Sequence, residues 1–121
     1  MAAAGLRILV IEDHPALGRF VAAALAGAGW AVLGPLGDHA SAMEAARHEP
    51  VDVAVTDRLV QGNETFAIAD ALAERGVRCV IMSGYPRSTL PERFQDLPFL
   101  EKPFTMDALI EAVRAAAIGP G

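Results

Sequence analysis

The stretch VDVAVTD, residues 51–57, decides the fold of this chain. Its valines are β-branched, one small alanine lies among them, and the run ends on a carboxylate, Asp57. Such a run is typical of a strand buried on both faces of a parallel sheet. Asp57 then lies at the carboxyl end of the strand, where open α/β sheets bind their ligands. Because burial strips a carboxylate of its hydration, an acid here indicates that its charge is needed.

Short apolar runs elsewhere in the chain predict four further strands. These runs are residues 7–11, 31–33, 78–82 and 99–101. Gly34-Pro35 ends the second strand of the chain, and a polar loop at residues 58–64 follows Asp57. Each strand therefore has a clear stop, as expected for the short strands of an α/β domain.

Apolar residues at helical spacing predict helices between the strands. Pro15 opens the first helix, Asp38 or Ser41 caps the second, and Thr105 caps the last. The third helix spans residues 66–75. Residues 86–95 contain two prolines and few apolar anchors, so we expect only a short or frayed helix there. The predicted inner faces carry Leu17, Phe20, Val21, Ala24 and Leu25, then Ala42, Ala45 and Ala46, and finally Leu109, Ile110 and Val113.

A strand and a helix alternate five times, which predicts a (βα)5 domain with a parallel sheet and helices on both faces. Right-handed crossovers then favour a doubly wound five-stranded parallel sheet with strand order 2-1-3-4-5. The chain's 121 residues fit one domain, residues 1–121, with a tail at 118–121. In this order strands one and three lie side by side.

Composition excludes several classes of function. The net charge of −5 argues against direct binding of nucleic acid or of an anionic membrane. No apolar run is long enough to cross a bilayer, and the opening MAAAGLR lacks the charged region of a signal peptide. The single cysteine, Cys79, cannot form an internal disulfide and indicates a reducing compartment. We therefore expect a cytoplasmic protein.

Acidic residues follow both central strands of the predicted sheet. Glu12 and Asp13 come after strand one, and Asp57 ends strand three, so the three carboxylates meet in one crevice. A small, hard cation with oxygen ligands, Mg²⁺, relieves their repulsion. Lys102 and Ser83, after strands five and four, add a positive charge and a hydroxyl donor. This set predicts a site where a carboxylate nucleophile, Asp57, forms an aspartyl phosphate.

The same combination of residues resembles the receiver domain of bacterial two-component response regulators, over residues 7–117. The resemblance implies a flavodoxin-like fold and phosphorylation of Asp57 by a histidine kinase or a phosphotransfer protein. It implies that Mg²⁺ is held by Glu12, Asp13, Asp57 and the backbone carbonyl of Leu59.

The resemblance also assigns roles to the residues around the phosphoryl group. Ser83 and Lys102 would contact that group, and Ser83 with Phe99 would form the switch. The switched partner would be a downstream protein or an attached output domain. The domain would act as an enzyme only on itself, in its own phosphorylation and autodephosphorylation.

Two departures from the usual receiver pattern stand out. The loop at residues 58–64 lacks the usual proline and glycine pattern, and the stretch from Ser83 to Lys102 is short. Ser83-Gly84-Tyr85-Pro86 is similar to an alphaproteobacterial-type subgroup with an atypical fourth-helix region. Because residues 86–95 have two prolines and little apolar anchorage, we expect low stability there, and we expect phosphorylation to act by ordering residues 84–95 rather than by rotating Phe99.

Other functions stay open at this point. An unphosphorylated pseudo-receiver could serve as a docking module, although the acidic triad and the lysine are intact. A phosphatase of the haloacid dehalogenase type would carry an Asp-x-Asp signature, but the second position here is Leu59. A flavodoxin-type electron carrier would need a phosphate-binding loop after strand one, which the sequence lacks. The chain is either a stand-alone regulator or a domain of a longer protein.

Overall fold

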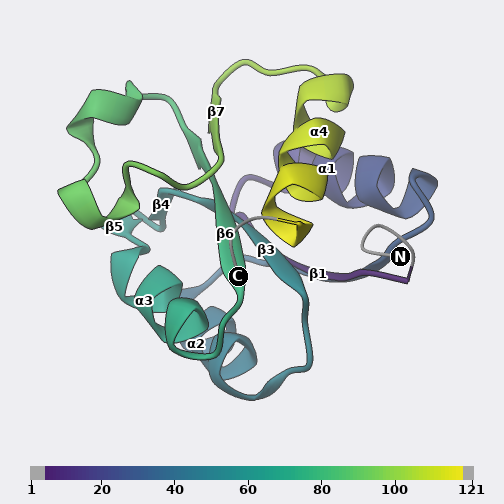
Figure 1. The fold of residues 1–121 in the computed structure, drawn as a ribbon, viewed down its shortest axis with the longest axis horizontal. Coiled ribbons are helices and arrows are strands. Elements are labelled where there is room, and N and C mark those ends of the chain that lie inside the picture. Colours follow the sequence, from purple (N-terminus) through teal and green to yellow (C-terminus); the bar gives the residue numbers. More distant parts are fainter. Residues whose placement is uncertain (1–4, 119–121) are drawn as a thin grey trace.

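The computed structural model describes residues 5–118. Five parallel strands form a sheet in the order β2-β1-β3-β6-β7 (Figure 1). This order confirms the predicted doubly wound sheet, with β1 and β3 as central neighbours. Along the chain the strands of this sheet are β1 (Arg7–Ile11), β2 (Ala31–Leu36), β3 (Val53–Asp57), β6 (Arg78–Ser83) and β7 (Phe99–Glu101).

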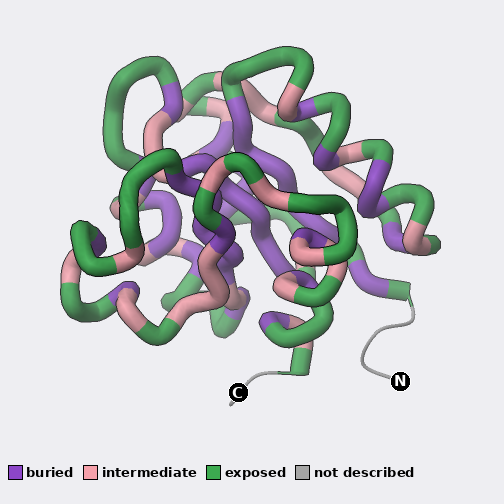
Figure 2. The backbone as a smooth tube through the Cα atoms, turned by 90° about the horizontal axis from the view of Figure 1, so that it is seen from above, coloured by how far each residue is buried: buried purple, intermediate pink, exposed green. Residues whose placement is uncertain are grey.

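Two helices cover each face of the sheet. Helices α1 (Pro15–Gly27) and α4 (Met106–Ala117) pack on one face, and α2 (His39–His48) and α3 (Phe66–Glu74) pack on the other (Figure 1). Because successive side chains of a strand point to opposite faces, β1 alternates between the two cores. Figure 2 shows the result: the buried residues gather at the centre of the molecule, and the exposed residues lie around its outside.

The predicted helix faces are largely confirmed. The alanines of α2, residues 42, 45 and 46, are buried, and Asp38 caps this helix by accepting from the N–H of Ser41 at 2.8 Å. Phe20 differs from the prediction, because this residue of α1 is 38% exposed. None of the helices within residues 5–118 is long and apolar enough to cross a membrane. Most of the predicted tail, residues 119–121, lies outside the described part of the chain.

Strand β2 continues past the predicted stop at Gly34-Pro35. Leu9 pairs with Leu33, but Ile11 pairs with Leu36, so β2 carries one extra residue at this point. Gly34 has φ +115°, and a Cβ on it would collide with the carbonyl oxygen of Val10. Proline is tolerated here because β2 is an edge strand. The prediction of a stop at residue 33 was therefore wrong.

The predicted polar loop after Asp57 contains a short hairpin. Strands β4 (Leu59–Val60) and β5 (Asn63–Glu64) pair antiparallel, joined by Gln61 and Gly62. Both turn residues have positive φ, 52° and 79°, as a two-residue hairpin turn of the I′ kind requires. Non-glycine residues rarely adopt this conformation, and Gln61 is not one of the residue types preferred there. The hairpin was therefore missed.

No α-helix forms between β6 and β7, in agreement with the expectation of a short or frayed helix. Two short 3₁₀ turns, η1 (Arg87–Thr89) and η2 (Glu92–Phe94), occupy the segment. The expectation of few apolar anchors was wrong, because Leu90 and Phe94 are buried. The ring of Phe94 stacks on that of Phe66, with centroids 5.2 Å apart.

Hydrogen bonds also join the two ends of the segment between β6 and β7. The Arg87 guanidinium donates to the carbonyl oxygens of Gln95 and Leu97, at 2.6 and 2.7 Å. The Gln95 amide donates back to the carbonyl oxygens of Arg87 and Leu90, at 2.9 and 2.8 Å. Such contacts satisfy backbone groups that no helix or sheet would satisfy.

Candidate functional site

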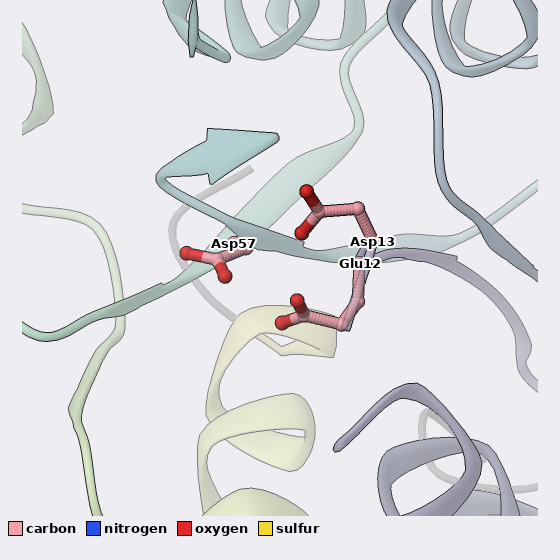
Figure 3. A group of neighbouring side chains, drawn as sticks. All are labelled: Glu12, Asp13 and Asp57. Atoms are coloured by element: carbon pink, nitrogen blue, oxygen red, sulfur yellow. The ribbon is translucent and has the colours of Figure 1, made fainter. Parts of the chain in front are cut away.

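Three carboxyl groups converge at the carboxyl edge of the sheet. Glu12 and Asp13 follow β1 directly, and Asp57 is the last residue of β3. These strands are paired neighbours, with Ile11 opposite Thr56, so the register brings the three acids together. One oxygen from each carboxyl group lies within 4.8 Å of the others. Figure 3 shows the three side chains turned toward a common space.

Asp57 is held on both carboxylate oxygens. Its Oδ2 accepts from the ammonium Nζ of Lys102 at 2.6 Å, and its Oδ1 accepts from the N–H of Leu59 at 3.2 Å. Its backbone carbonyl accepts from the hydroxyl of the buried Thr65 at 2.8 Å. The side chain is 10% exposed, so its orientation is set by these contacts.

Glu12 is buried and only partly satisfied. Its Oε2 accepts from the N–H of His14 at 3.0 Å. Its Oε1 has no hydrogen-bond partner among the described residues, and the Nζ of Lys102 lies 3.7 Å away. Burial, with Asp57 close by, raises the pKa of Glu12 from its usual 4.5 to about 7, against the opposing effects of the His14 N–H and of Lys102.

Asp13 is exposed at the mouth of the site. Its Oδ2 accepts from the N–H of Gln61 at 2.8 Å. Because Gln61 is in the turn of the β4–β5 hairpin, this bond links the hairpin to the carboxylate that follows β1.

The arrangement fits a divalent cation. Three acids face one lysine, and a buried carboxylate oxygen, Glu12 Oε1, lacks a partner among the described residues. A buried polar atom without a partner is costly, and a cation would satisfy it. Oxygen donors of this kind suit Mg²⁺ or a similar hard ion. In the described part of the chain, no other group of acids, histidines and cysteines meets so closely.

Ser83 ends β6 at the carboxyl edge of the sheet, whereas Phe99 begins β7 opposite Ile81, and both side chains have other contacts. The hydroxyl of Ser83 donates to the carbonyl oxygen of Tyr85 at 2.9 Å and accepts from its N–H at 2.8 Å. The ring of Phe99 is half-buried, and the guanidinium of Arg87 lies 5.1 Å from its centroid. The roles of Ser83 and Phe99 toward a phosphoryl group, like that of the Leu59 carbonyl toward a metal, stay predictions.

Sequence reasoning missed three supporting side chains. Thr65 binds the backbone of Asp57, and His39 contacts the β4–β5 hairpin. Arg58 forms a two-point ion pair with Glu64 and also donates to Thr89 in η1. Its position directly after Asp57 was visible in the sequence, but its partners come from separate elements.

Comparisons with known proteins agree with this geometry. No family model matches the chain. The transcriptional regulatory protein PdtaR of Mycobacterium tuberculosis is 27% identical over 119 residues, which cover 95% of this chain and 58% of that protein. The chain thus spans little more than half the length of this curated relative.

Two solved structures match over almost their whole length. SdrG from Sphingomonas melonis is 30% identical with a TM-score of 0.82, covering 98% of this chain and 100% of SdrG. A response regulator receiver protein from Sinorhizobium medicae is 27% identical with a TM-score of 0.80, covering 93% and 94%.

The doubly wound sheet and the acidic cluster at its carboxyl edge define a receiver domain. Together with these relatives, they show that the chain belongs to the response regulator receiver family. A phosphatase of the haloacid dehalogenase type and a docking-only pseudo-receiver are not favoured. The more specific alphaproteobacterial-type subgroup stays a prediction.

Proposed function

We propose that this chain is the phosphoacceptor receiver of a two-component phosphorelay, with Asp57 as the acceptor. The observation that carries the proposal is the position of Asp57, which faces two further acids and is bonded to Lys102 at 2.6 Å. Transfer to a carboxylate needs positive charge near the phosphoryl oxygens. Lys102 supplies one such charge, and a cation held by the three acids would supply the other.

Mg²⁺ is the cation that this donor set suits best. Glu12, Asp13 and Asp57 would hold it, together with the carbonyl oxygen of Leu59. When bound, the metal would neutralise negative charge on the phosphoryl oxygens. This assignment also gives Glu12 Oε1 a partner.

The chain's own residues then carry the transfer. A carboxylate oxygen of Asp57 forms a bond to phosphorus while the phosphorus–nitrogen bond of a donor phosphohistidine breaks. Lys102 offsets charge on the acceptor and on the transferred group. The Ser83 hydroxyl would donate to the phosphoryl group after leaving the backbone of Tyr85. The donor is a histidine kinase or a phosphotransfer protein.

The activity is confined to the domain itself. It would promote its own phosphorylation by the donor and its own autodephosphorylation. The signal passes to a downstream protein or to an output domain attached to this one, in the cytoplasm, with no direct contact to nucleic acid. Residues 1–121 form a single domain in this proposal.

Mg²⁺-dependent labelling tests the proposal directly. Incubation with acetyl phosphate and Mg²⁺ should add the mass of one phosphoryl group, and EDTA should prevent it. Lys102→Ala should lower the labelling rate by roughly 10²-fold, as expected when one transition-state donor is removed. Arg47→Ala, an exposed cation in the last turn of α2, is the control. Labelling that proceeds equally well in EDTA would contradict the proposal.

A further inference from the structure

The β4–β5 hairpin is attached to helix α2 by one side chain. His39, the first residue of α2, places its Nε2 3.1 Å from the carbonyl oxygen of Val60 and 3.3 Å from that of Asn63. Val60 and Asn63 are the pair that closes the hairpin turn. Because both partners are acceptors, Nε2 must carry the hydrogen.

The hairpin in turn holds two of the three acids. The N–H of Leu59 donates to Asp57 Oδ1, and the N–H of Gln61 donates to Asp13 Oδ2. A shift of the hairpin therefore changes the orientation of both carboxylates. Groups that orient metal ligands affect metal affinity without touching the metal.

Each end of the hairpin has its own tether. At the open end, Arg58 binds Glu64, and the hydroxyl of Thr65 binds the carbonyl oxygens of Asp57 and Arg58. At the turn end, the side chain of Val60 is fully buried. His39 links this end to α2, and the strained residue Gln61 presents its N–H to Asp13 in the same turn.

We propose that His39 is a positioning residue for the acceptor site. Its Nε2–H holds the closing pair of the hairpin and so fixes the Gln61 and Leu59 amides against Asp13 and Asp57. The expected consequences, tighter metal binding and faster phosphorylation, rest on the proposed function. The claim that His39 holds the hairpin in place does not depend on that function.

Three variants separate positioning from general stability. His39→Ala removes the donor, and His39→Gln keeps an N–H donor at the reach of Nε2. His48→Ala is the matched control, because His48 is exposed at the other end of the same helix. All measurements are made well below the unfolding temperature, so that only folded protein is compared.

The first readout is amide exchange of Gln61 in metal-free protein. His39→Ala should speed this exchange, whereas His39→Gln and His48→Ala should leave it near the wild-type rate. Unchanged exchange of Gln61 in His39→Ala would overturn the proposal, and so would a failure of His39→Gln to restore it. This readout applies whether or not the protein binds a metal.

The second readout is Mg²⁺ affinity, measured by titration calorimetry. Groups bonded directly to a metal ligand typically change affinity 10- to 100-fold, so the more remote His39→Ala should weaken binding roughly three- to tenfold. Equal Mg²⁺ affinity in His39→Ala and wild type would overturn the positioning role. If wild type bound no Mg²⁺ at all, the proposed function would fail, and Gln61 exchange would still decide the role of His39.

Discussion

Glu12 shows at the level of one residue how the site differs from an ordinary cluster of surface acids. It is buried, and one of its oxygens lacks a hydrogen-bond partner among the described residues. A stable protein retains such an atom only where another group normally satisfies it. Lys102 lies near but is bonded to Asp57, so a single lysine serves two acids.

The raised pKa of Glu12 predicts how stability depends on pH in metal-free protein. Between its usual pKa of 4.5 and about 7, the folded protein binds more protons than the unfolded chain. The free energy of unfolding should therefore fall as pH rises through this range. The loss is at most about 3–4 kcal/mol, at about 1.36 kcal/mol for each unit of pKa.

Urea unfolding in EDTA, between about pH 5 and about pH 8, measures this dependence. Glu12→Gln should flatten it, because the amide does not titrate. Glu111→Gln, at an exposed acid of α4, should leave the wild-type slope. If Glu12→Gln shows the same slope as wild type, the buried carboxyl is not its source.

At the scale of elements, the bulge in β2 supports the site from the edge strand. The extra residue at Gly34-Pro35 brings the carbonyl oxygen of Leu36 to the N–H of Glu12, at 2.9 Å. The backbone of Glu12 is thus paired by β2 after β1 itself has ended. The bulge depends on Gly34, whose φ of +115° and crowding by Val10 exclude a side chain.

Gly34→Ala should therefore lower the free energy of unfolding by roughly 2–4 kcal/mol, through both the clash and the backbone strain. Gly27→Ala is the control, because a Cβ there meets nothing within 4 Å. Since Gly27 lies in α1, its replacement should be neutral or stabilising by about 1 kcal/mol. Chemical denaturation measures both. Equal stability of the two variants would mean that β2 adapts to a side chain at position 34.

The buried anchors between β6 and β7 change the expected output mechanism. Low anchorage was the reason to expect that phosphorylation orders residues 84–95. Leu90, Phe94 and the Arg87 contacts already hold this segment. The ordering mechanism has therefore lost its physical basis, and Arg87 links the segment to the ring of Phe99.

The features predicted correctly from the sequence were those marked by a pattern of neighbouring residues. Strands β1 and β7 were predicted with their observed bounds, because an apolar run and a polar stop mark each one. The acids and Lys102 were predicted to meet because parallel strands share a carboxyl edge. The hairpin, the continuation of β2 and the contact of His39 depend on backbone conformation or on partners distant in sequence, which no local pattern shows.

At the scale of the whole molecule, the fold brings three strand ends together in one site. β1 supplies Glu12 and Asp13, β3 supplies Asp57, and β7 leads to Lys102. The two apolar cores fix these strands from both faces, so the site stands on rigid elements.

Locating the phosphoryl group tests the central claim, that Asp57 is the acceptor. After acetyl phosphate and Mg²⁺ treatment, borohydride reduction converts an aspartyl phosphate to homoserine, and peptide mass analysis finds the position. The expected result is conversion at Asp57 in wild type and no conversion in Asp57→Asn. A reduced side chain at Glu12, Asp13 or another residue, with Asp57 unmodified, would contradict it.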